Sequence, residues 1–116
     1  MPSLNELVTK LRAWASGHDR HVQAAVDLLI EHGHWIGNRG FRDTCVHVED
    51  RVAWIDWQDA RQAFDSGRFG AASTSEQAVL DYAIALAEDR YDFRGLDSRN
   101  AVAVLDATVH ALGLEL

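Results

Sequence analysis

Side chains that could do chemistry are most concentrated in the segment TCVHVEDRVAWIDW, residues 44–57, which holds the only cysteine of the chain. Residues at i and i+2 of a strand share a face, so Cys45 and His47 could form a thiol–imidazole pair. A reactive thiolate also needs electropositive surroundings, whereas Glu49 and Asp50 are acidic. We therefore interpret Cys45 as a small buried apolar residue and predict no catalytic residue here.

The histidines offer little for metal binding. Zinc sites usually take their ligands from compact, matched pairs. The short spacings in this chain are mixed and straddle the ends of predicted helices, where histidine commonly interacts with backbone carbonyls. They are His18 with His21, His32 with His34, and Cys45 with His47. We predict that the protein binds no metal and no cofactor.

Asp106 and His110 are four residues apart and could form a hydrogen-bonded pair on one helix. The surrounding segment, AVAVLDATVHAL, is apolar nearly all round. Such a helix is expected either in the centre of the fold, with Leu105 in the core, or at a subunit interface, which leaves a homodimer open. We favour a polar pair at the edge of the core over an acid–base dyad. A small hydrolase using Cys45 or His110 is our third alternative for function.

These residues would be positioned mainly by helices. Capping boxes at Ser3 with Glu6 and at Ser73 with Glu76 predict two helix starts, and aspartates predict three more. The aspartates are Asp19, Asp56 and Asp97, and glycines that predict helix ends follow at Gly17, Gly33, Gly67 and Gly113. We expect a single domain, residues 1–116, of the α+β class, mostly α, with about five helices.

The exception to this helical pattern is the segment 45–55, where β-branched and aromatic residues alternate with polar ones. It predicts a small β-hairpin after the second helix, turning at Glu49 and Asp50. With a two-residue turn there, Cys45 would lie opposite Trp54, and His47 would lie opposite Val52.

Charge is distributed unevenly along the 116 residues, whose formal net charge is −7. Residues 1–46 are balanced, whereas residues 47–116 carry thirteen acidic and six basic side chains. An acidic surface repels phosphate backbones and attracts basic partners, so nucleic acid is an unlikely ligand and a basic protein surface is the expected one. No apolar run has the ~20 residues of a membrane span, and we expect a cytoplasmic protein.

A DNA-binding alternative depends on the segment VQAAVDLLIEHGHWIGNRGFRDTC. It predicts a helix, a turn and a short helix opening near Asn38, and the hairpin that follows could be a wing. This arrangement resembles the opening half of a winged helix-turn-helix domain, in which Arg39 and Arg42 could contact phosphates. The next helix, DWQDARQAFDSG, is acidic where such a function would need bases. A winged-helix-like fold without the DNA function therefore stays open, since such scaffolds often serve protein contacts.

A second resemblance covers roughly residues 22–113. It is carried by LLIEHGHWI, FRDTCV, WIDWQDARQAFDSG, STSEQAVLDYAIALAEDRY and LDSRNAVAVLDATVHALG. In this order the segments are similar to small uncharacterised proteins of actinobacteria and their phages and plasmids. The resemblance implies a small accessory protein of a phage or mobile element, and it implies no catalytic residues.

From charge and resemblance together we predict a non-enzymatic accessory protein that binds a host protein through an acidic face, as an inhibitor or DNA mimic. A winged-helix-like transcription regulator is the alternative. Tryptophan is frequent at binding hot spots, and exposed carboxylates set association rate and partner choice. The predicted contact residues are Trp54, Trp57, Asp59, Asp65, Glu88, Asp89 and Asp92.

Overall fold

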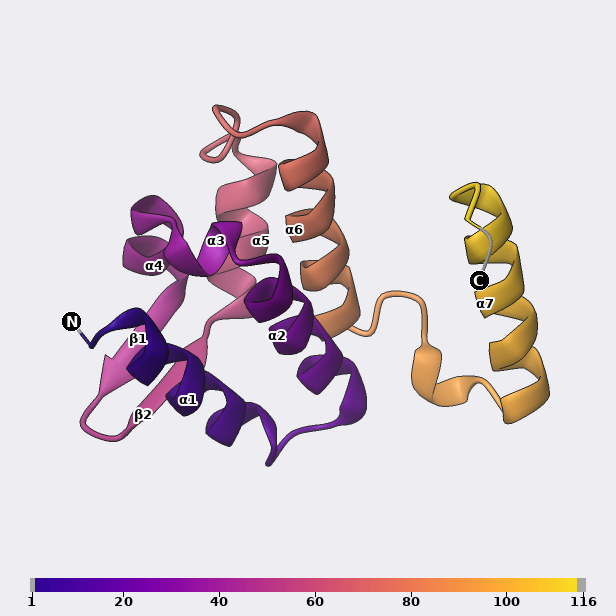
Figure 1. Ribbon diagram of the computed structural model, residues 1–116, viewed down its shortest axis with the longest axis horizontal. Coiled ribbons are helices and arrows are strands. Elements are labelled where there is room, and N and C mark those ends of the chain that lie inside the picture. The colour runs from indigo at the N-terminus through magenta and orange to yellow at the C-terminus, as the bar shows by residue number, and fades with distance from the viewer. Residues whose placement is uncertain (1, 115–116) are drawn as a thin grey trace.

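Within residues 2–114, which the computed structural model describes, seven helices surround or follow one two-stranded hairpin (Figure 1). In chain order they are α1 (Leu4–Ala15), α2 (Arg20–His32), α3 (His34–Gly37), α4 (Arg39–Cys45), β1 (Val46–Glu49), β2 (Val52–Ile55), α5 (Trp57–Asp65), α6 (Thr74–Ala87), the 3-10 turn η1 (Phe93–Gly95) and α7 (Ser98–Ala111). This confirms the predicted class, α+β and mostly α. None of the described helices is long and apolar enough to cross a membrane.

All five predicted helix starts are confirmed, since Ser3, Asp19, Asp56, Ser73 and Asp97 are the N-cap residues. The Ser73 box is complete: its hydroxyl accepts a hydrogen bond from the Glu76 amide at 3.1 Å, and the Glu76 carboxylate accepts one from the Ser73 amide at 3.0 Å. These bonds stabilise the ionised carboxylate, so they hold the pKa of Glu76 below its ordinary value.

Two short helices, α3 and α4, separate α2 from the hairpin, which therefore follows the fourth helix. Gly33 makes the break after α2 because its φ of 84° is a left-handed conformation that favours glycine. Asn38 starts α4 by accepting a hydrogen bond from the Phe41 amide at 2.9 Å. The segment was expected to contain one short helix near Asn38. It forms two because Trp35 and Ile36 are buried together on a turn of their own.

The hairpin turn lies one residue further along the chain than predicted, so each residue of β1 pairs with a residue two positions further along β2. Asp50 and Arg51 form the turn, His47 lies opposite Trp54, and Cys45 ends α4 rather than joining the strand. Asp50 takes a left-handed backbone with φ 49°, a conformation that aspartate adopts more readily than most residues. Moving the turn by one residue changes every cross-strand pair, so the expected pairs of Cys45 with Trp54 and of His47 with Val52 are wrong.

One hydrophobic core is shared by the six helices α1 through α6 and by the hairpin. Helices α2 and α6 lie side by side, and α1 lies against β2 (Figure 1). The largest fully buried side chains are Trp35, Phe41, Leu7, Leu11, Leu29, Ile36, Ile55, Leu80, Ile84, Val26 and Cys45. All belong to residues 2–87, the part of the chain that we call the body.

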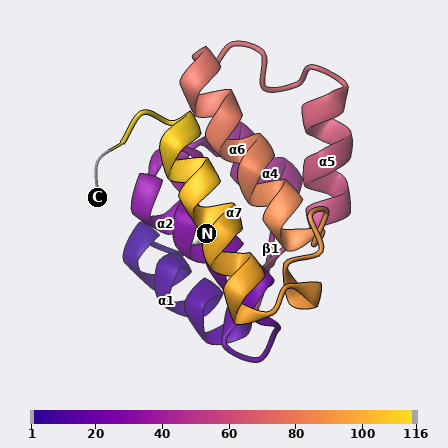
Figure 2. The same cartoon turned by 90° about the vertical axis from the view of Figure 1, so that its right-hand side faces the viewer.

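The last helix, α7, lies outside the body (Figures 1 and 2). Every residue of α7 is exposed except Val109, which is half-buried. The prediction that Leu105 lies in the core is therefore wrong for a single chain, because its side chain is 59% exposed. The apolar pattern of α7 fits a helix in the centre of the fold or a helix at a subunit interface. The helix is not buried within its own chain.

Replacing Leu80 of α6 with alanine should lower the free energy of unfolding by ~2–5 kcal/mol, because the side chain is fully buried in the hydrophobic core. Leu4→Ala is the matched control: it removes the same atoms from a residue that is 48% exposed, and should cost less than ~1 kcal/mol. Urea denaturation measures both, and equal losses would contradict the assignment of the core to the body.

Candidate functional site

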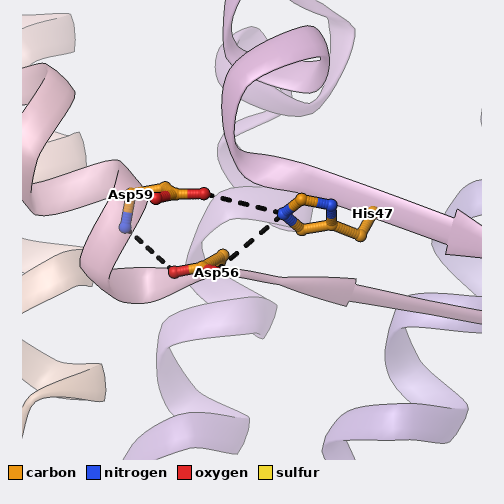
Figure 3. Close-up of side chains that lie close together, drawn as sticks. All are labelled: His47, Asp56 and Asp59. Atoms are coloured by element: carbon orange, nitrogen blue, oxygen red, sulfur yellow. Dashed lines mark hydrogen bonds and ion pairs between the residues drawn. The ribbon is translucent and has the colours of Figure 1, made fainter.

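The densest group of reactive side chains is formed by His47, Asp56 and Asp59 (Figure 3). His47 extends from β1, Asp56 caps α5, and Asp59 lies in the first turn of that helix. His47 Nε2 is 3.7 Å from Asp59 Oδ2 and 4.0 Å from Asp56 Oδ2. The Asp59 amide donates to Asp56 Oδ1 at 2.9 Å, which fixes the two carboxylates relative to each other. The junction of strand and helix thus directs all three groups to one place.

The geometry of this group is compatible with weak binding of a cation. His47 Nε2 is shielded from solvent and has no hydrogen-bond partner among the described residues, although two carboxylate oxygens lie just beyond hydrogen-bond distance. Three donors would fill only part of the coordination shell of a divalent cation, so water would have to complete it. The side chains of all three residues are also well exposed, which favours solvation. That the protein binds no metal stays a prediction.

Sequence reasoning paired His47 with Cys45, and the structure pairs it with Asp56 and Asp59 instead. The Asp56 and Asp59 spacing is visible in the sequence, but their approach to His47 depends on the hairpin register. His47 also stacks on Trp54, with ring centroids 5.5 Å apart, because the two residues are cross-strand partners. A correct prediction of the hairpin turn would have been needed to bring His47, Asp56 and Asp59 together.

Cys45 is confirmed as a buried apolar residue. Burial is the main cause that raises the pKa of its thiol, from an ordinary 9.0 to about 12, and the nearby carboxylates of Asp59 and Asp56 add to the effect. The neutral thiol is therefore the stable form at physiological pH, and it is a poor nucleophile.

Arg61 organises the acidic side chains on the face of α5 and α6. Its guanidinium donates to Asp81 at 2.9 Å, to Glu88 at 3.2 Å and, more weakly, to Asp65 at 3.4 Å. Burial by itself lowers the pKa of Arg61, but hydrogen bonds to Glu88 and Asp81 outweigh it and raise the pKa above its ordinary value. Sequence reasoning missed this residue, although the spacing of Arg61 and Asp65 by four on one helix was a signal for it.

The predicted acidic contact residues do not form one unpaired patch. Asp65 and Glu88 share Arg61, and Asp59 lies beside His47. The Asp89 carboxylate accepts hydrogen bonds from the Phe93 amide at 2.9 Å and from Arg94 Nε at 3.1 Å, so it orders the connection that follows α6. Asp92 is exposed in that connection and takes a left-handed backbone with φ 52°.

The remaining predicted contact residues are less exposed than expected. Trp54 and Trp57 are both half-buried, and Trp57 packs against the core. The residues of the DNA-binding alternative, Arg39 and Arg42, both lie on α4, where Arg39 is exposed and Arg42 is half-buried.

Asp106 and His110 lie on α7 and are both exposed. The expectation that they form a polar pair at the edge of the core is wrong, because α7 does not reach the core. No hydrogen bond joins the two side chains within residues 2–114.

Comparison with family models, with curated proteins and with solved structures gives no match to this chain. The assignment of a function therefore depends on the geometry of the chain itself.

Arg61→Ala should destabilise the fold by ~1–3 kcal/mol, because three carboxylates lose their cationic partner, whose side chain is only 15% exposed. Arg90→Ala is the control, since Arg90 is 50% exposed, pairs with Glu88 alone, and should cost under ~1 kcal/mol. Denaturation at low and high salt measures both, and the cost of Arg61→Ala should shrink as salt screens the repulsion that remains. Indistinguishable variants would show that the Arg61 cluster contributes nothing.

Cys45 should react with a thiol reagent at pH 8 far more slowly in the native chain than in denaturant. Its raised pKa also predicts a pH effect: between about pH 9 and about 12 the unfolded chain releases this proton and the folded chain keeps it, so stability falls as pH rises. Cys45→Ala lacks this contribution and should lose less stability over the same range. Equal reactivity in native and denatured protein would contradict the burial of the thiol.

Proposed function

We propose that this protein is a non-enzymatic protein-binding factor and that α7 supplies its main contact surface. The observation that carries the proposal is an apolar helix of 14 residues held outside the body with nearly every residue exposed. An isolated helix of this length is marginal in water, and contiguous exposed apolar surface marks an interaction site. Insertion of a helix into a groove is a common form of protein recognition.

The acidic character of residues 47–116 has a secondary role in this proposal. Four of the predicted acidic contact residues already lie beside a cationic or titratable side chain of the same chain, which leaves less charge to offer a partner. The net charge of −7 still attracts basic surfaces at long range and so contributes to association rate and partner choice. Affinity would come from the apolar residues of α7.

A non-enzymatic role is supported by the chemistry of the reactive groups. Cys45 is buried and neutral, Asp106 and His110 are exposed on an isolated helix, and the residues of the His47 group are only half-buried. The sequence resemblance adds the expectation of an accessory protein of a phage or mobile element that acts on a host protein.

The test is capture of proteins from a lysate of the source organism by the immobilised chain. Leu105→Glu puts a charge on the exposed surface of α7 and keeps a good helix former, so recovery of a specific partner should fall by about tenfold or more. Leu4→Glu makes the same change on α1 at a similar exposure and should leave recovery unchanged. If both variants recover the same proteins as the wild type, or if no variant recovers any, the proposal fails.

A further inference from the structure

The single chain exposes more surface than a compact protein of its size. Its accessible surface is 7561 Å² for 12.9 kDa, about 1,200 Å² above the roughly 6,300 Å² typical of a compact monomer of this mass. Its radius of gyration is 14.9 Å, whereas a compact domain of this length has about 13.4 Å. The excess exceeds the ~800 Å² that each partner buries in a standard interface. The excess is therefore large enough for one complete protein interface.

The apolar residues of α7 have the spacing of a coiled-coil seam. Val102, Leu105 and Val109 of α7 and the C-cap residue Leu112 follow one another at intervals of three, four and three residues, the pattern of a and d positions in a heptad. Valine occupies both a positions and leucine both d positions, a combination that favours two-stranded pairing. We call these four residues the α7 stripe. The charged residues of the helix, Arg99 and Asp106, lie outside it.

A second apolar surface includes other residues of the same helix. Val104 and Thr108 of α7 line a hollow of about 310 Å³ together with Tyr82, Tyr91, Phe93 and Leu96. Val104 is the neighbour of Leu105 and lies about 100° from it around the helix. Both tyrosines are among the exposed large apolar residues. Thr108 takes a g position of the same heptad, which flanks the seam, so a helix laid along the stripe would lie beside the edge of this hollow.

We propose that a second copy of this chain covers the α7 stripe, so that the α7 helices of two copies pair around a twofold axis. This inference rests on the proposed function and names the partner of α7. A twofold interface requires a self-complementary surface, and a stripe of valine at a and leucine at d is its own best-matched partner. The 14-residue helix is only ~21 Å long, so the hollow beside Tyr82 and Tyr91 supplies contacts that so short a seam lacks.

Sedimentation equilibrium of the full chain tests the pairing at micromolar concentrations. The wild type should have twice the mass of one chain, Leu105→Glu should have the mass of one chain, and Leu4→Glu should remain a dimer. Far-UV circular dichroism checks that both variants retain the folded body. A monomeric wild type, a dimeric Leu105→Glu variant, or a Leu4→Glu variant that also dissociates would each overturn the inference.

A second measurement keeps the wild-type seam almost unchanged. Leu105→Cys adds one exposed thiol to a chain whose own cysteine is buried, so a disulfide-linked dimer can form only through residue 105. Mild oxidation should link most of the Leu105→Cys protein and little of a Leu4→Cys control, and equal linkage would count against pairing through α7.

The two proposals fail in different ways. If the wild type is monomeric but Leu105→Glu loses a captured protein, α7 binds a different partner and only this inference falls. If Leu105→Glu changes neither the mass nor the capture, both proposals fall.

Discussion

Burial of the Trp35 indole is the interaction on which the rest of the body depends. Its ring packs against Phe41 and Phe69, and its Nε1 donates to the carbonyl of Glu76 at 2.8 Å. An indole N–H left without a partner in a core would cost free energy, so this bond sets where the start of α6 lies relative to α3. Once α6 is held there, it packs along α2, and the Phe69 loop closes over the tryptophan.

The ion pairs between α5 and α6 follow from that packing. Because α5 and α6 are neighbours, Arg61 reaches carboxylates on both helices and on the residue that ends α6. A chain with a large acidic excess would otherwise place like charges close together along this face. The same side chains that suggested an acidic binding surface thus contribute to holding the body together.

The body and α7 have different relations to solvent. The body buries its apolar side chains, including the side chain of its one cysteine, whereas α7 exposes a seam of valine and leucine. Asp89 and Asp92, both with left-handed backbones, turn the connection away from α6, and Asp89 is hydrogen-bonded within it. The connection therefore leads α7 away from the body, and the apolar seam of α7 is exposed in the single chain.

The sequence by itself determined the features that depend on neighbours within four residues. Ser73 and Glu76 cap a helix wherever that helix lies, and Gly33 ends one because few other residues accept its backbone conformation, so the helix limits and the α+β class were predictable. The hairpin register, the place of His47 between two aspartates and the pairing of Arg61 were decided by tertiary structure, because each joins residues that only packing brings together. Leu105 shows the same limit most clearly. The apolar pattern around Leu105 is typical of a helix that packs against another surface. The pattern is the same whether that surface belongs to the same chain or to another.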